Sequence, residues 1–270
     1  MYEEFYGLTE PPFNITPDPR YLYFSRRHRE AYEHILFGID QRKGFIQITG
    51  EVGAGKSTLC RAVLEALGEG VSTALILNPV LTQIQLLRTI VRELGLEDCG
   101  NDRVRLQQRL NAFLLERAAA DQEVVLFVDE AQDMSDELLE QVRLLSNLET
   151  DERKLLQIVL IGQPELRAKL ARPGLRQLSQ RITVRYHLGP IGRSETESYI
   201  LHRLEVAGAN GRPTFSRWAL AAIYRHSRGV PRLINAICDK ALLCGYVEGC
   251  DRLGWHHVRR AVRELKGGGR

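Results

Sequence analysis

The residues best suited to chemistry lie in one glycine-rich run, Gly50-Glu-Val-Gly-Ala-Gly-Lys-Ser57, which fits the pattern G-x-x-x-x-G-K-[ST] without a mismatch. Glycines allow successive N–H groups to turn toward one anion, and a helix that begins here adds its positive amino-terminal end. Lys56 would reach the β- and γ-phosphates of a nucleotide, and the Ser57 hydroxyl would ligate Mg²⁺. The nucleotide-binding residues predicted in this run are Gly50, Glu51, Val52, Gly53, Ala54, Gly55, Lys56, Ser57 and Thr58.

A second candidate is a pair of acids, Asp129 and Glu130, at the end of the apolar run 124–128. An aspartate at the carboxyl end of a strand can hold Mg²⁺, and the glutamate beside it can orient and polarise a water. Alone, such a run is often a strand end with a solvated turn. Here it follows the glycine-rich run by about two strand–helix units, which favours a catalytic role.

Four further side chains have weaker signals. Gln163 follows the apolar run 157–161, where it could contact the γ-phosphate or the attacking water, or be an ordinary turn glutamine before a proline. Arg181 and Arg176 precede a strand and could enter a neighbouring subunit's site, although helix-terminal arginines also favour the helix dipole. Arg232 follows Pro231 in the first turn of a predicted helix, where a cation is unfavourable unless an anion such as a γ-phosphate is its partner.

These residues require a scaffold of alternating strands and helices. Four of five β-rich runs are almost continuously apolar, as in a parallel sheet buried on both faces, and helical patterns separate them. The sequence therefore predicts a doubly wound α/β fold. The expected strands are residues 45–49, 73–77, 124–128, 157–161 and 183–188. The expected helices are residues 26–42, capped by Ser25, and 57–67, 83–94, 104–119, 136–147 and 165–170.

The two ends of the chain differ from the middle in residue composition and in predicted secondary structure. Residues 1–24 are rich in proline and aromatic residues and predict an extended, ordered arm. After Pro190 the sequence predicts only helices, at 194–208, 216–227, 231–246 and 255–265, with no convincing strand. We therefore expect an arm over residues 1–24, an α/β core over 25–190, a helical domain over 191–265 and a flexible tail over 266–270.

The composition excludes several classes of protein. Hydrophobic residues make up 44% and charged residues 26%, near globular averages, and the formal net charge is only +3. The five cysteines form no C-x-x-C pair and do not lie at zinc-ligand spacing from histidines, so we expect reduced, mostly buried thiols. The sequence contains no signal-peptide pattern and no apolar run long enough to span a membrane. We therefore expect a cytoplasmic chain, with docking at the inner membrane through a partner left open.

With these motifs in order, the chain resembles AAA+ ATPases, and more narrowly the general-secretion-pathway protein A (ExeA-type) ATPases with their relatives at type IV pilus (MshM-type) and exosortase loci. The most specific pieces are the opening F-Y-G-L-T-E-P-P-F-N-I-T-P-D-P-R-Y-L-Y, then G-E-V-G-A-G-K-S, V-D-E-A-Q, I-G-Q-P-E-L and G-V-P-R-L-I-N. The resemblance covers nearly the whole chain.

The resemblance implies a parallel five-stranded sheet of order 5-1-4-3-2 with a helical lid. It implies a Walker A motif at 50–57, a Walker B motif at Asp129 and Glu130, and sensor 1 at Gln163. It also implies an arginine finger near Arg181 and sensor 2 at Arg232. Residues 17–28, which include Tyr21 and Leu22, would line the adenine.

The implied function is Mg²⁺-dependent ATP hydrolysis coupled to shape change and to self-assembly, as a ring or a filament, in a secretion, pilus or polymer-export system. Family members often continue into a membrane span and a peptidoglycan-binding domain. Neither is found up to Arg270, so we expect an ATPase that depends on an adaptor. The alternative is a DNA-associated regulator of transposition (TniB-like), with Arg259, Arg260 and Arg263 as phosphate contacts. The small net charge and the lack of a helix-turn-helix pattern weigh against it.

Overall fold

The computed structural model describes residues 1–97, 100–149 and 153–267, and these form two compact units. The α/β unit comprises Glu30–Glu51 and Leu59–Leu188. The helical unit comprises Met1–Arg29, Val52–Thr58 and Gly189–Arg270. The chain therefore crosses between the units several times, and the segment Val52–Thr58 belongs by its contacts to the helical unit.

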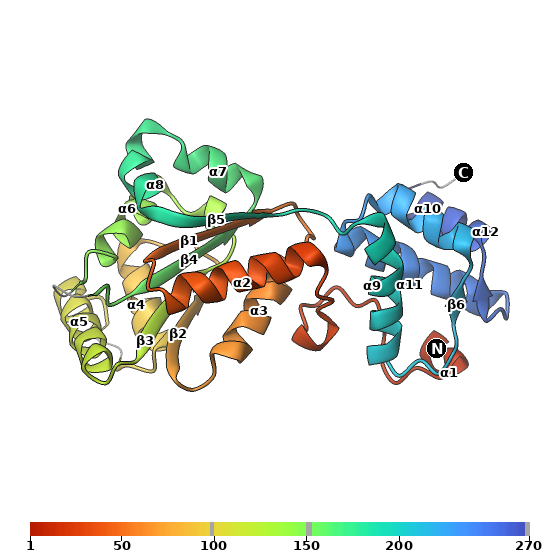
Figure 1. Cartoon of the computed structure of the whole chain (residues 1–270), viewed down its shortest axis with the longest axis horizontal. Helices are drawn as coiled ribbons and strands as arrows, with labels where there is room; N and C mark the ends of the chain where they lie inside the picture. Colours follow the sequence, from red (N-terminus) through yellow and green to blue (C-terminus); the bar gives the residue numbers. More distant parts are fainter. Residues whose placement is uncertain (98–99, 150–152, 268–270) are drawn as a thin grey trace. The chain divides into compact units, whose positions relative to one another are not determined.

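The α/β unit is built on a five-stranded sheet of order β2-β3-β4-β1-β5, as the resemblance implied, in which all strand pairs are parallel (Figure 1). Four of its strands have no exposed position, as in a sheet covered on both faces, whereas β5 at the edge alternates buried and exposed residues. The strands are β1 (Phe45–Gly50), β2 (Val71–Ile76), β3 (Glu123–Val128), β4 (Gln157–Gly162) and β5 (Ile182–Leu188).

Helices cover both faces of this sheet. On one face, alternate strand residues such as Ala74, Leu126 and Leu160 pack in a cluster with residues of α4 to α8. On the other face α2 approaches so closely that a Cβ at Gly38 would lie 2.6 Å from Ile46 Cδ1. The helices of this layer are α2 (Arg26–Asp40), α3 (Lys56–Leu67), α4 (Gln83–Glu93), α5 (Arg103–Ala119), α6 (Asp136–Leu145), α7 (Pro164–Leu170) and α8 (Arg176–Arg181), with the 3₁₀ turns η2 (Ala131–Asp133) and η3 (Pro173–Leu175).

The helical unit has its own hydrophobic core. Its long helices lie within two residues of the predicted bounds and are α9 (Arg193–Val206), α10 (Arg217–Ser227), α11 (Pro231–Val247) and α12 (Trp255–Leu265). The prediction of no strand here was wrong, because β6 (Thr214–Phe215) pairs in parallel with β7 (Arg252–Leu253). Two-residue strands are too short to show a period of two in the sequence.

The amino-terminal arm is not fully extended. It begins with α1 (Tyr2–Tyr6), which ends at Gly7 with φ of 70°, and it later forms the 3₁₀ turn η1 (Pro19–Tyr21). The Tyr2 hydroxyl donates to Asp239 Oδ1 at 2.6 Å, and the Tyr6 hydroxyl donates to the Leu242 carbonyl at 3.1 Å. Both partners lie on α11, so the arm is part of the helical core rather than a loose extension.

Candidate nucleotide-binding site

The predicted phosphate-binding run connects β1, which ends at Gly50, to α3, which begins at Lys56. Gly53 and Gly55 have φ of 78° and 97°, a region that side-chain-bearing residues rarely adopt. Lys56 is only 6% exposed, whereas Glu51 and Val52 lie at the surface. This strand–turn–helix context is the one that a triphosphate-binding loop requires.

Two other residues of the helical unit contact this loop. The Arg232 N–H, in the first turn of α11, donates to the Gly53 carbonyl at 3.1 Å, and a Cβ at Gly53 would collide with the Arg232 side chain. Arg232 therefore lies beside the loop. The helix dipole disfavours a positive charge in the first turn of α11. An anion bound to the loop would therefore be a suitable partner for the Arg232 guanidinium.

The second contact comes from His28, a buried residue in the first turn of α2 that sequence reasoning placed only near the adenine. His28 Nε2 lies 3.0 Å from the Ala54 carbonyl oxygen, which can only accept a hydrogen bond, so Nε2 carries the proton. His28 Nδ1 then accepts from the Ser25 hydroxyl at 2.7 Å. A Cβ at Gly55 would lie 2.9 Å from His28 Nε2. Burial lowers the pKa of His28, which keeps the ring neutral and this bonding pattern intact.

The arm residues predicted to line the adenine are buried. Tyr21 is 5% exposed and lies under the Arg203 guanidinium, whose Cζ is 4.5 Å from the centre of the Tyr21 ring. Leu22 is 8% exposed. Burial raises the pKa of the Tyr21 hydroxyl to about 12, so this side chain stays neutral.

The acidic pair of the α/β unit follows β3. Asp129 is 4% exposed, and its Oδ1 accepts from the Glu130 N–H at 2.9 Å. Thr49 of β1 pairs with Gly162 of β4, and Val128 of β3 pairs with Leu160. The carboxyl ends of these three parallel strands therefore share one edge of the sheet, where ligands of open α/β sheets bind.

Glu130 is held in a network of amides within the same unit. Its Oε2 accepts from Gln132 Nε2 at 3.0 Å and from Gln163 Nε2 at 3.4 Å. Gln132 Oε1 in turn accepts from the Gln163 N–H at 2.9 Å, in a space that a Cβ at Gly162 would enter. The predicted residues Glu130 and Gln163 are thus brought together by Gln132. In the sequence, Gln132 is only the last residue of V-D-E-A-Q, and no role was predicted for it.

The two candidate finger residues differ in their surroundings. Arg181 Nη1 donates to Ser146 Oγ at 3.0 Å and also to Asn147 Oδ1. Arg176 is exposed. A finger role for Arg181 would require exchanging these two hydrogen bonds for contacts to a nucleotide.

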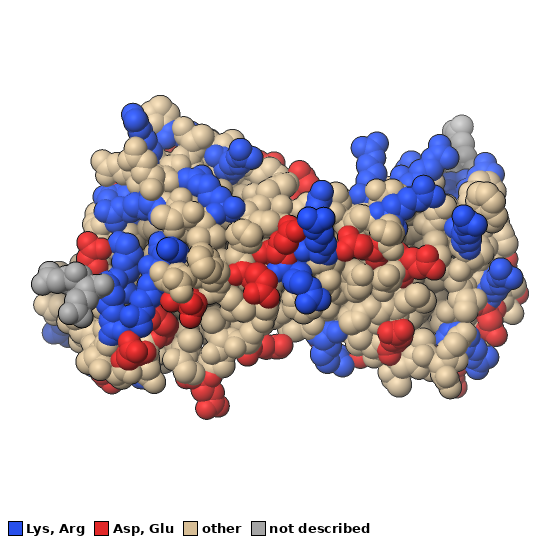
Figure 2. All heavy atoms as spheres, in the orientation of Figure 1, with Lys and Arg blue, Asp and Glu red and all other residues tan. Residues whose placement is uncertain are grey.

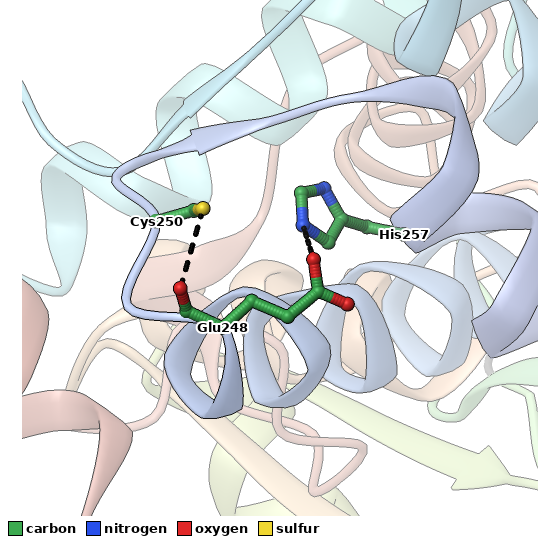
Figure 3. Close-up of side chains that lie close together, drawn as sticks. All are labelled: Glu248, Cys250 and His257. Atoms are coloured by element: carbon green, nitrogen blue, oxygen red, sulfur yellow. Dashed lines mark hydrogen bonds and ion pairs between the residues drawn. The ribbon is translucent and has the colours of Figure 1, made fainter.

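A separate cluster in the helical unit contains residue types that bind metals, although sequence spacing gave no sign of it. Ligand atoms of Glu248, Cys250 and His257 lie within 4.8 Å of one another (Figure 3). The Gly254 N–H donates to His257 Nδ1 at 2.8 Å, so the ring proton is on Nε2, which lies 3.1 Å from Glu248 Oε2. A metal on Nε2 would displace that proton while Nδ1 still accepts, leaving the ring without a proton. These contacts instead cap the start of α12 and attach it to the end of α11.

The described cysteines agree with reduced thiols. Cys60, Cys238 and Cys244 are buried and Cys250 is partly buried, all unpaired, while Cys99 lies outside the described residues. Burial raises the pKa of the Cys60 and Cys238 thiols, which makes them poor nucleophiles. Across the described part of the chain, no helix is both long enough and apolar enough to cross a bilayer.

Comparison with known proteins agrees with this geometry. Residues 39–170, which include the phosphate-binding loop, Asp129, Glu130 and Gln163, match the AAA domain family. The chain is 47% identical over 270 residues to general secretion pathway protein A of Aeromonas hydrophila. The match covers 99% of this chain and 49% of that protein, so the chain spans about half the length of this relative.

Similar solved structures include the ORC2 protein of Aeropyrum pernix in ADPNP–ADP complexes, with a TM-score of 0.68, 17% identity and coverage of 97% of this chain and 72% of that chain. The Drosophila ORC bound to DNA gives a TM-score of 0.70, 19% identity and coverage of 95% and 65%. Cdc6p of Pyrobaculum aerophilum gives 0.71, 15% identity and coverage of 94% and 70%. At these identities the likeness concerns the fold alone. The chain thus has an AAA+-type fold, its residues 39–170 match the AAA domain family, and nearly its whole length is similar to general secretion pathway protein A.

Proposed function

We propose that this chain hydrolyses ATP and uses the cycle of binding and hydrolysis to change shape and to assemble within a cell-envelope secretion system. The observation that carries the proposal is the loop Val52–Thr58. It has the glycine conformations of a phosphate-binding loop and is contacted by Arg232 and His28 of the helical unit. The 47% identity to general secretion pathway protein A supports the choice of a secretion system.

The residue types in and after the loop support the proposed binding of ATP. Backbone N–H groups between Gly53 and Ser57 would surround the phosphates, and Lys56 would neutralise β- and γ-oxygens. Tyr21 and Leu22 are proposed to border the base. When Mg²⁺ is bound with the nucleotide, Ser57 and Asp129 would hold it, and it would screen the phosphate charge.

Hydrolysis would use Glu130 as the acceptor of a proton from the attacking water. As the water oxygen bonds to the γ-phosphorus, the bond from phosphorus to the β–γ bridging oxygen breaks and ADP leaves. Gln132 and Gln163 already donate to the Glu130 carboxylate, so they set its direction.

Coupling to shape change would come from the loop's dual position. It is covalently continuous with β1 and α3, yet by its contacts it belongs to the helical unit. A γ-phosphate held by Lys56 and Arg232 would bias both units at once, and loss of that phosphate would release the bias. We propose self-association in the ATP state and docking at the inner membrane through a partner.

The test compares two variants in nucleotide binding and turnover. Lys56→Ala should lower ATP affinity by about 100-fold or more, because it removes the cation from the phosphate site. Glu130→Gln keeps the size and the hydrogen bonds but cannot take a proton, so it should bind ATP normally while turnover falls by about 100-fold. Fluorescent-nucleotide titration and phosphate release measure the two quantities.

A wild-type turnover in Glu130→Gln would remove Glu130 from the mechanism, and undiminished ATP binding in Lys56→Ala would contradict the proposed loop. The same assay with and without duplex DNA tests the alternative of a DNA-associated regulator. Capture of secretion-system components by Glu130→Gln with ATP, but not by Lys56→Ala, tests the proposed assembly.

A further inference from the structure

Basic residues are concentrated in two segments of the helical unit. Residues 206–238 contain five arginines and no acid, and residues 252–267 contain five basic residues and one glutamate. Together these segments carry a formal charge of +9, whereas the whole chain carries +3. The rest of the chain is therefore net acidic. The small net charge of the whole chain is the sum of this acidic part and a strongly basic region.

The fold places the two segments side by side. Thr214 pairs with Arg252 and Phe215 with Leu253, so the short β6–β7 pair sets the starts of α10 and α12 next to each other, and the two helices pack together. At their other ends, burial lowers the pKa of His226, and the charges of Lys266 and Arg225 lower it further. Figure 2 shows Lys and Arg side chains gathered over this part of the helical unit, with few acids between them.

This surface also carries both tryptophans of the chain. Trp218, at the start of α10, is 76% exposed, and Trp255, at the start of α12, is 49% exposed. Arg259 and Arg263 follow Trp255 at intervals of four residues along one side of α12. We call Trp218, Arg225, Trp255, Arg259, Arg263 and Lys266 the Trp–Arg face. All six are exposed, and none of its four basic side chains makes an ion pair within the described residues.

The pairing of residue types indicates an anionic surface with an apolar interior. Guanidinium groups bind phosphates in two-point contacts, and tryptophan prefers the boundary between water and lipid. Arg259 lies over the Trp255 ring, 5.1 Å from its centre, so that ring face is occupied and does not offer a stacking platform to a nucleic acid base. At a lipid interface the same Arg–Trp pair can stay formed, with arginine at the phosphates and the ring edge at the acyl boundary.

We propose that the Trp–Arg face docks this domain directly on membranes that contain anionic phospholipids. The contact is peripheral. The side chains of the Trp–Arg face would touch the lipid headgroups, and α10 and α12 would not span the bilayer. The docking requires neither ATP nor hydrolysis, so it can be tested without nucleotide and independently of the proposed ATPase function.

The chain offers a direct readout, because its only tryptophans belong to the proposed contact. Mixing the full chain with phosphatidylglycerol-containing vesicles should shift tryptophan emission to shorter wavelength and bring the protein into the sedimented vesicle fraction. Phosphatidylcholine vesicles should do neither. Trp218→Phe and Trp255→Phe leave one reporter each, and both should show the shift.

Charge variants supply the matched comparison. Arg259→Glu with Arg263→Glu should weaken binding to anionic vesicles by about tenfold or more. Arg109→Glu with Arg167→Glu makes the same charge change at exposed positions of the α/β unit and should leave binding near wild type. Circular dichroism confirms that both double variants are folded.

Four results would overturn the proposal. One is an unchanged tryptophan emission with anionic vesicles, and another is equal binding to phosphatidylcholine. The third is equal loss of vesicle binding in both double variants, which would make net charge rather than this face responsible. If a single-stranded oligonucleotide binds the face more tightly than the vesicles and displaces them, the ligand is nucleic acid and the lipid assignment is wrong.

Discussion

Glu130 combines a proposed catalytic role with an unusual backbone conformation. Its φ of 50° lies in the left-handed region, which costs a residue with a side chain about 1 kcal/mol. This conformation turns the chain from β3 into η2, where Gln132 and Gln163 donate to the carboxylate. The strain is therefore retained at the position where the direction of one carboxylate matters most.

His28 gives a prediction at the same scale. His28→Ala removes the donor to the Ala54 carbonyl and should weaken ADP binding by about tenfold, because the loop loses an anchor and must be ordered by the nucleotide. His28→Gln keeps an amide donor and should recover part of the affinity. His34→Ala, an exposed substitution on the same helix, is the control. Calorimetric titration with ADP measures all three, and full affinity in His28→Ala would show that the loop keeps its shape unaided.

At the scale of elements, the amino-terminal arm is held by one buried arginine of α9. Arg203 is 7% exposed, and its guanidinium donates to the Pro12 carbonyl at 2.6 Å and to the Asn14 carbonyl at 3.0 Å. It also stacks on Tyr21. Pro12 and Asn14 lie in the part of the arm between α1 and η1, where the backbone has no ladder partners, so Arg203 satisfies carbonyls that a neighbouring strand would otherwise bind.

Arg203→Ala should therefore lower the free energy of unfolding by about 2–3 kcal/mol, because two carbonyls lose a charged donor. It should also make the bond after Arg20 a faster site of trypsin cleavage, since the arm is released. Urea unfolding and timed proteolysis measure these effects. Arg193→Ala, at an exposed position of the same helix, should change neither, and equal cleavage rates in the two variants would contradict the role given to Arg203.

At the scale of the whole molecule, the histidines whose pKa is lowered by burial all belong to the helical unit. They are His28, His202, His226 and His257. In the unfolded chain each of them binds a proton near pH 6.5, whereas in the folded chain each binds it only at lower pH. The stability that they contribute is thus present above about pH 6.5 and is lost as the pH falls through their folded pKa values.

Thermal unfolding should therefore occur at lower temperature at pH 5.5 than at pH 7.5, and tryptophan fluorescence should detect the loss, because Trp218 and Trp255 both lie in the helical unit. His28→Gln should reduce the pH dependence, since one of the four groups no longer titrates. A helical unit that is equally stable at both pH values would contradict the assignment of these rings as neutral in the folded chain.

Assembly is the other property of the whole molecule. If Arg181 is the finger, Arg181→Ala should bind ATP with wild-type affinity but lose turnover by about 100-fold or more. Arg176→Ala then serves as the comparison, and the reverse pattern would assign the finger to Arg176. Turnover per subunit should rise with protein concentration in the wild type and in Arg176→Ala but not in Arg181→Ala, because a finger acts on a neighbouring subunit. A wild-type rate in both variants would exclude a finger at either position.

Local patterns were sufficient for the scaffold and for the identity of the candidate residues. The glycines at 53 and 55, the acids after β3 and the prolines at 164 and 231 mark chain turns by their own backbone chemistry, so strands, long helices and the phosphate-binding run were predicted within a few residues. The order of the sheet came from the family resemblance and was confirmed.

Contacts between residues far apart in the sequence were decided only by the tertiary structure. His28 meets Ala54, Arg203 meets Pro12, and Gln132 joins Glu130 to Gln163. The short elements α1, β6 and β7 also escaped prediction. The physical reason is the same in each case. A periodic pattern reports which face of an element is buried, but hydrogen-bond partners and two-residue strands depend on which other segment packs there, and no local pattern contains that information.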